Sequence, residues 1–235
     1  MFDAILFDLD GTLIDTESVA LRIGLQSFAD LGVSVDIAFL HSLVGIDLPS
    51  SAAIISAAHP LVDQNALHVA WRQGFHDATL AGGLALKSGV TDLLNARLRP
   101  MAVVTSSGRL EAHRKLDLAG ISAAFDLVVT LDDVTRAKPA PDAYLLAAAR
   151  MGVSPARCLV FEDSEAGAEA AHRAGCVVVQ VPDVVPSDGR WAHHLVDDMI
   201  SGARAAGLVF CSWRWAGLPI LRTPRPRGWL QIPVM

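Results

Sequence analysis

The sequence predicts a doubly wound α/β fold, in which helices cover both faces of a parallel sheet. Five short apolar runs recur along the 235 residues without polar alternation, which is typical of strands buried on both faces. Segments with helical patterns separate these runs, and this alternation indicates a parallel sheet. A hydrophobic content of 52% supplies enough apolar material for a sizeable core.

The individual elements can be placed along the chain from these patterns. Strands are predicted at residues 5–7, 101–105, 127–130, 159–161 and 177–181. Helices between the later strands are predicted at residues 110–119, 142–151 and 164–174. A glycine directly follows each of these three helices, which is common where a helix ends in a left-handed residue.

A long helical insertion separates the first predicted strand from the second. It is far longer than a normal crossover and shows helical patterns at residues 18–31, 37–43, 50–58 and 65–80. Long insertions of this kind are usually functional lids. We therefore predict an α/β core of residues 1–15 and 86–209, a helical cap of residues 16–85, and an irregular C-terminal tail of residues 210–235.

Charge and composition argue against several classes of protein. The formal net charge is -6 and the pI is about 5.7, whereas a nucleic-acid-binding surface is usually basic. No apolar run approaches the roughly 18 residues that cross a bilayer, and the N-terminus carries no basic leader. The three cysteines, Cys158, Cys176 and Cys211, fit neither a zinc site nor a disulfide framework. We expect a cytoplasmic protein with no nucleic-acid and no membrane partner.

Polar side chains follow several of the predicted strands, at the edge where an open α/β sheet places its site. Asp8 and Asp10 follow the first strand, and Glu162 and Asp163 follow the fourth. The complete set of motifs is DLDGT at 8–12, TSS at 105–107, KPAPD at 138–142 and FEDSEAG at 161–167. We expect four acids, a hydroxyl group and a lysine to meet at this edge.

The four motifs, in this order, resemble the haloacid dehalogenase-like superfamily of hydrolases. The resemblance is to its phosphatase and phosphomutase branch, which includes phosphoglycolate phosphatase and β-phosphoglucomutase. One acidic pair alone would be a weak signal, because such pairs are common in turns, but four motifs in the family's order are specific. The resemblance frames residues 8 to about 167, and it implies a Rossmann-like core, a helical cap and Mg²⁺ as cofactor.

The resemblance implies catalytic roles for four residues. Asp8 would attack phosphorus and become an aspartyl phosphate. Asp10 would protonate the leaving oxygen and then activate water. Ser106 would hydrogen-bond the phosphoryl oxygens, and Lys138 would neutralise Asp8 and the phosphate.

The resemblance also implies a metal site with oxygen ligands, which suit Mg²⁺. Its ligands would be Asp8, the backbone carbonyl of Asp10, and Asp163, with Glu162 bound directly or through water. A carboxylate and an anionic ester repel each other by about 4 kcal/mol at ~4 Å in a site of effective dielectric ~20. A divalent cation and Lys138 would offset this repulsion.

Four further residues are expected to bind the substrate: Thr12, Thr16, Ser107 and Arg109. Thr12 would order the turn after the first motif, and Arg109 would bind a second anionic group of the substrate. For Ser106 and Ser107, a simple helix cap remains the alternative.

Individual residues distinguish the branches of the superfamily. Dehalogenating members lack the second aspartate, which is present here as Asp10. Phosphonate-cleaving members need a lid lysine, and residues 16–80 contain none. Mutases of the β-phosphoglucomutase type carry a histidine where this chain has Ala20 and an arginine where it has Leu48. The sequence therefore favours transfer of the phosphoryl group to water.

The predicted function is that of a Mg²⁺-dependent phosphatase acting on small phosphate monoesters, either sugar phosphates or phosphoglycolate-like acids. The expected partner is a small phosphorylated metabolite, and the chain is expected to be a monomer or a homodimer. Two alternatives remain open, a hexose-phosphate mutase and a non-catalytic protein that binds phosphoryl ligands.

Overall fold

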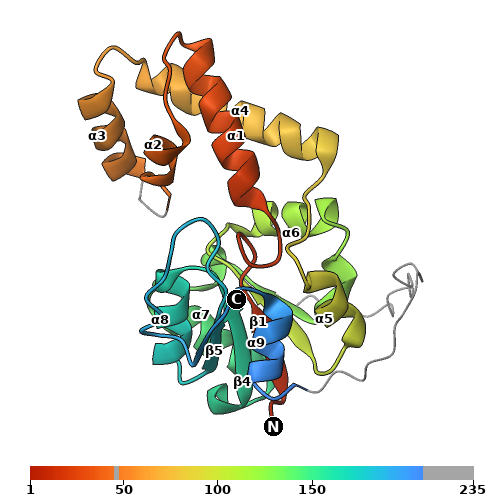
Figure 1. The fold of residues 1–235 in the computed structure, drawn as a ribbon. Helices are drawn as coiled ribbons and strands as arrows, with labels where there is room; N and C mark the ends of the chain where they lie inside the picture. The colour runs from red at the N-terminus through yellow and green to blue at the C-terminus, as the bar shows by residue number, and fades with distance from the viewer. Residues whose placement is uncertain (45–47, 209–235) are drawn as a thin grey trace, which may run out of the picture.

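The computed structural model describes residues 1–44 and 48–208, which form an α/β unit with a group of helices above it (Figure 1). Within the described residues, the strands make one six-stranded sheet in the order β3-β2-β1-β4-β5-β6, and all its pairs are parallel. The strands are β1 Ala4–Phe7, β2 Met101–Val104, β3 Leu127–Val129, β4 Cys158–Glu162, β5 Val177–Gln180 and β6 His194–Leu195. The doubly wound parallel fold expected from the sequence is confirmed.

Helices cover both faces of this sheet because the side chains of each strand alternate between the two faces. Phe7, Val103 and Phe161 point to one face, where they pack with buried residues of α5 Val90–Ala96, α6 Arg109–Leu118 and α9 Met199–Ala205. Leu6 and Val160 point to the other face, which is covered by α7 Asp142–Met151 and α8 Glu165–Arg173. Three short 3₁₀ helices complete the described core, at Ser122–Ala124, Leu131–Asp133 and Pro155–Arg157.

The register of the sheet brings the ends of its central strands together. Phe7, the last residue of β1, lies opposite Val103 on one side and Phe161 on the other. The residues that follow β1, β2 and β4 therefore emerge at the same edge. This is the edge that carries the acidic motifs.

Five helices lie between β1 and β2, and the first four of them form a group of their own. These four are α1 Thr16–Asp30, α2 Ile37–His41, α3 Leu48–Ala58 and α4 Gln64–Gly82, and Figure 1 shows them above the carboxyl edge of the sheet. They share a small core of their own, which includes Leu21, Phe28 and Leu67. The indole N–H of Trp71 in α4 donates a hydrogen bond to the Ala20 carbonyl of α1 at 2.9 Å. This group of helices corresponds to the segment predicted as the cap.

Three elements of the core are absent from the sequence-based prediction: β6, α5 and α9. The strand β6 has only two residues, and the two helices have seven residues each, so none of them carries enough repeats to show a period. The tail predicted at 210–235, together with Cys211, lies outside the described residues. Within the described ranges, no helix combines the length and the hydropathy that crossing a membrane requires.

Candidate active site

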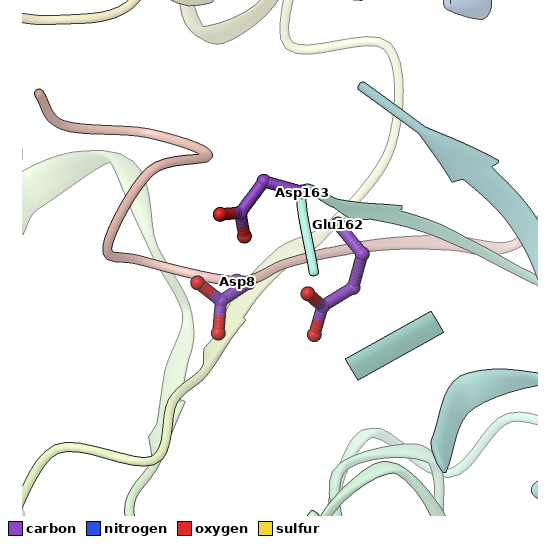
Figure 2. Close-up of side chains that lie close together, drawn as sticks. All are labelled: Asp8, Glu162 and Asp163. Carbon is purple, nitrogen blue, oxygen red and sulfur yellow. The ribbon is translucent and has the colours of Figure 1, made fainter. Parts of the chain in front are cut away.

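Three carboxylates converge at the carboxyl edge of the sheet. Asp8 follows β1, Glu162 is the last residue of β4, and Asp163 comes next in the chain. Among the described residues, these three form a group in which one carboxylate oxygen of each residue lies within 4.8 Å of one oxygen of each of the others (Figure 2). Asp8 is 7% exposed and Glu162 is fully buried. Such a set of close, hard oxygen atoms suits a divalent cation such as Mg²⁺.

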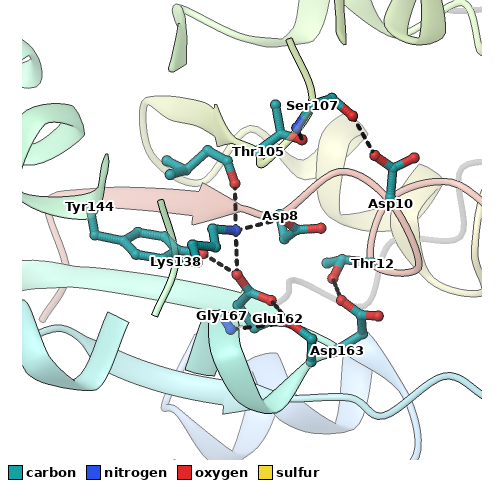
Figure 3. Close-up of polar contacts among 12 residues, drawn as sticks. Asp8, Asp10, Thr12, Thr105, Ser107, Lys138, Tyr144, Glu162, Asp163 and Gly167 are labelled. Atoms are coloured by element: carbon teal, nitrogen blue, oxygen red, sulfur yellow. Dashed lines mark hydrogen bonds and ion pairs between the residues drawn. The ribbon is translucent and has the colours of Figure 1, made fainter. Parts of the chain in front are cut away.

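Lys138 holds two of these acids together (Figure 3). Its Nζ lies 2.6 Å from Asp8 Oδ1 and 2.6 Å from Glu162 Oε1, and it donates a third hydrogen bond to the Val104 carbonyl at 2.9 Å. The Tyr144 hydroxyl donates to the same oxygen of Glu162. All three N–H groups of the lysine thus have acceptors, and its side chain is only 6% exposed.

Burial and repulsion from neighbouring acids favour the neutral forms of Asp8 and Asp163. Burial raises the pKa of Asp8 to about 7, with Lys138 opposing the rise and the charge of Glu162 adding to it. Burial also raises the pKa of Asp163, and the charges of Asp8 and Glu162 raise it further. Burial lowers the pKa of Lys138, but Asp8 and Glu162 more than reverse this, so that its pKa is raised. The site contains three acids and one lysine, Lys138, which contacts two of them. A cation bound among the acids would offset the excess of negative charge.

Two glycines allow these carboxylates to lie where they do. Gly11 has a φ of +79°, and a Cβ atom there would lie 2.3 Å from Asp163 Oδ2. A Cβ atom on Gly167 would lie 2.0 Å from Glu162 Oε1. Any other residue at either position would displace an acid of the cluster. The glycines of the first and fourth motifs are therefore part of the geometry of the site.

The carboxylate of Asp10 lies outside the cluster, beside Ser107 (Figure 3). Its Oδ2 accepts a hydrogen bond from the Ser107 hydroxyl at 2.9 Å. The Nζ of Lys115 lies 2.8 Å from Asp10 Oδ1 and 2.9 Å from Oδ2. Each of the two motif aspartates thus has its own lysine, with Lys138 on Asp8 and Lys115 on Asp10.

Lys115 was missed by the sequence-based reasoning. Helix α6 shows no strong motif, but the spacing of Glu111 and Lys115 is a weak signal, because side chains four residues apart meet on a helix. Lys115 Nζ lies 3.1 Å from Glu111 Oε1. The lysine is nevertheless only 8% exposed, so it is turned into the protein toward Asp10.

The hydroxyl groups of the second motif differ in their surroundings. Thr105 is buried, and its Oγ1 accepts a hydrogen bond from the Ser107 amide at 3.0 Å. Ser107 contacts Asp10, as described above. Ser106 is exposed, and the structure does not bring it into these polar contacts. Of the three hydroxyl groups in this motif, that of Ser107 contacts an acid of the site, and that of Thr105 accepts from the Ser107 amide.

A family model described as haloacid dehalogenase-like hydrolase matches residues 2–175. The chain belongs to this family of hydrolases. The resemblance expected from the four motifs is confirmed, and so is an enzymatic activity.

Individual relatives of this haloacid dehalogenase-like hydrolase are phosphatases by name. Fructose-1-phosphate phosphatase YqaB of Escherichia coli (strain K12) is 35% identical over 183 residues, which cover 77% of this chain and 96% of the relative. Validoxylamine A 7'-phosphate phosphatase of Streptomyces hygroscopicus subsp. limoneus is 35% identical over 184 residues, covering 76% and 85%. A solved structure of a putative β-phosphoglucomutase from Thermotoga maritima matches with a TM-score of 0.71 and 27% identity, covering 83% and 94%.

Of the four residues predicted to bind substrate in this hydrolase, Thr12 and Arg109, like Ser107, contact acidic side chains of the protein. The Thr12 hydroxyl donates to Asp163 Oδ1 at 3.1 Å. Thr16 is buried at the start of α1. Arg109 forms an ion pair with Asp133, with its Nη2 3.0 Å from Oδ1, although its side chain is 57% exposed. The same Asp133 oxygen also accepts hydrogen bonds from both Nη atoms of Arg150 at 3.2 Å, so two guanidinium groups share one carboxylate.

Proposed function

We propose that this hydrolase is a Mg²⁺-dependent phosphatase that acts on small phosphate monoesters, with sugar phosphates as the first candidates. The observation that carries the proposal is the position of Asp8, one oxygen of which is bound by Lys138 at 2.6 Å beside the acids of β4. The named activities of the two curated relatives support the same class of reaction. The hydrolysis we propose has two steps, and Asp8 and Asp10 have different tasks in them.

In the first step, an Asp8 carboxylate oxygen attacks phosphorus and forms an aspartyl phosphate, while the bond from phosphorus to the alcohol oxygen breaks. Lys138 holds Oδ1 of Asp8, which leaves the second oxygen for the attack. Asp10 gives its proton to the departing alcohol oxygen. In the second step, Asp10 takes a proton from water, and the water oxygen displaces Asp8 from phosphorus to release phosphate.

The residues proposed to hold Mg²⁺ are Asp8 and Asp163, with the backbone carbonyl of Asp10 and with Glu162 either directly or through water. The bound cation would offset the repulsion between the Asp8 carboxylate and the anionic ester. Glu162 already accepts hydrogen bonds from Lys138 and Tyr144, so one of its oxygens is occupied without metal. Its other oxygen accepts only a long hydrogen bond of 3.3 Å among the described contacts, from Ser164.

The contacts to the phosphoryl group and to the rest of the substrate are also proposals. We propose that the hydroxyl groups of Thr105 and Ser107, in place of that of Ser106, form the hydrogen bonds to the phosphoryl oxygens. The ion pair of Arg109 with Asp133 uses Nη2, and the Arg109 side chain is 57% exposed, so we propose that Arg109 binds a second anionic group of the substrate. The protein would work in the cytoplasm, as a monomer or homodimer, on small phosphorylated metabolites.

The test is the release of inorganic phosphate from a panel of sugar, polyol and carboxylic acid monophosphates. We expect turnover of at least one sugar phosphate with Mg²⁺, complete loss of turnover in EDTA, and recovery when Mg²⁺ is restored. Full activity in EDTA would contradict the assigned metal site.

The same panel distinguishes the alternatives. Because a putative β-phosphoglucomutase shares the fold at a TM-score of 0.71, glucose 1-phosphate should be included and its products identified. Conversion to glucose 6-phosphate without phosphate release would indicate a mutase. A chain that binds phosphate but turns over no member of the panel would be a non-catalytic binding protein.

A further inference from the structure

We propose that Lys115 is a positioning residue for Asp10, which holds the acid of the reaction in place for the leaving oxygen. The proposal rests on the phosphatase function proposed above. It concerns a side chain that lies on α6, outside all four sequence motifs. It is based on the contacts that join the Asp10 carboxylate to Lys115 and Ser107, apart from the other acids of the site.

The contacts of Lys115 fix the Asp10 carboxylate from one side. The Nζ of Lys115 is within 2.9 Å of both oxygens of Asp10 and 3.0 Å from the Ser107 hydroxyl. Ser107 in turn donates to Oδ2 of Asp10. The three groups thus form a closed triangle of hydrogen bonds. Charge-assisted hydrogen bonds of this kind are stronger than neutral ones and restrict the rotation of the carboxylate.

Helix α6 provides a rigid base for this triangle. Ala112 and Leu116, which flank Lys115 on the inner face, are at most 1% exposed in the core beneath the sheet. The lysine side chain is 11% exposed, whereas the Asp10 side chain is 29% exposed. The lysine is therefore the anchored partner, and Asp10 is the partner that is open to a ligand.

The arrangement separates the tasks of the two aspartates. Asp8 lies with Glu162 and Asp163 and is paired with Lys138, whereas the Asp10 carboxylate is not part of that metal-binding group. Without Lys115, the carboxylate of Asp10 would keep only the hydrogen bond from Ser107 and would be free to rotate. If Asp10 is displaced, the rate falls only for substrates whose leaving oxygen needs a proton, because proton transfer requires the acid to be within hydrogen-bond distance of that oxygen.

The experiment compares two leaving groups with the complete protein and Mg²⁺. A sugar phosphate needs a proton on its leaving oxygen, whereas p-nitrophenyl phosphate releases a stable phenolate. For Lys115→Met we expect kcat/KM for the sugar phosphate to fall about 100-fold, within the range of general acid catalysis. For p-nitrophenyl phosphate we expect a fall of about threefold or less, because that reaction depends little on the acid.

Two further variants keep the test decisive. Glu111→Gln removes the other acidic partner of Lys115 and should leave both reactions unchanged. Lys115→Arg keeps the positive charge and should recover a large part of the sugar phosphate activity. Lys115→Gln, which lacks the charge, replaces Lys115→Met if that variant does not fold in thermal unfolding measurements, and the same selective fall for the sugar phosphate is expected.

Two outcomes would overturn the proposal. An equal fall for both substrates would mean that Lys115 acts only on the stability of the site. If kcat/KM falls for neither substrate, Asp10 does not need Lys115 to hold its position. If the wild type hydrolyses no monoester at all, the phosphatase proposal itself has failed, which is a different result.

Discussion

Asp8→Asn is expected to lower phosphate release by at least about 10⁴-fold, because the loss of a catalytic nucleophile typically costs that much or more. An amide oxygen is a poor nucleophile at phosphorus, and the variant also loses a ligand of the proposed metal site. The measurement is the rate of phosphate release with Mg²⁺ at saturating substrate. The fold should survive, since the two side chains have nearly the same shape.

The control for this variant is Asp3→Asn. Asp3 precedes the same strand but is exposed and paired with Arg157 on the surface. We expect its replacement to leave the rate unchanged. A rate for Asp8→Asn within tenfold of the wild type would show that another group attacks phosphorus.

Lys138→Met is expected to impair both activity and stability. Removal of the lysine leaves the Asp8 and Glu162 carboxylates close together without a cation, in a site where both are buried. Breaking a buried ion pair by removing one partner typically costs about 3–5 kcal/mol. We expect a loss of that size in the free energy of unfolding, measured with urea in EDTA. We also expect a loss of about 10²–10³-fold in kcat, as for removal of one group that stabilises transition-state charge.

Lys87→Met is a matched control for the effect on stability. Lys87 pairs with Asp183 at 2.5 Å, but its side chain is 27% exposed, so the pair is partly open to water. Such pairs contribute about 1 kcal/mol or less. If the free energy of unfolding in EDTA falls no more for Lys138→Met than for Lys87→Met, Lys138 does not offset the charge of the buried acids.

The core sheet and the acids of the site were predictable because each depends on a local pattern. Every strand from β1 to β5 contains a continuous apolar run, and the acidic motifs lie directly after β1 and at the end of β4. The parallel register then brings Asp8 and Asp163 together without further information.

The residues that were missed depend on packing between distant segments. Lys115 and Asp10 are 105 positions apart, and only the docking of α6 on the sheet shows that they meet. Ser106 was chosen from a run of three hydroxyl residues, and the sequence does not say which of them faces inward. The structure answers this through the burial of Thr105 and the contact of Ser107 with Asp10.

The most direct test of the account is to look for the phosphoryl group on Asp8 during turnover. Wild-type protein with Mg²⁺ and a good substrate is quenched in acid at successive times, digested and analysed by mass spectrometry. If Asp8 is the nucleophile, the peptide containing Asp8 gains the mass of one phosphoryl group, and this gain is absent in Asp8→Asn and in a sample with EDTA. A phosphoryl group on a different residue, or an unmodified peptide at every time while phosphate accumulates, would contradict this role of Asp8.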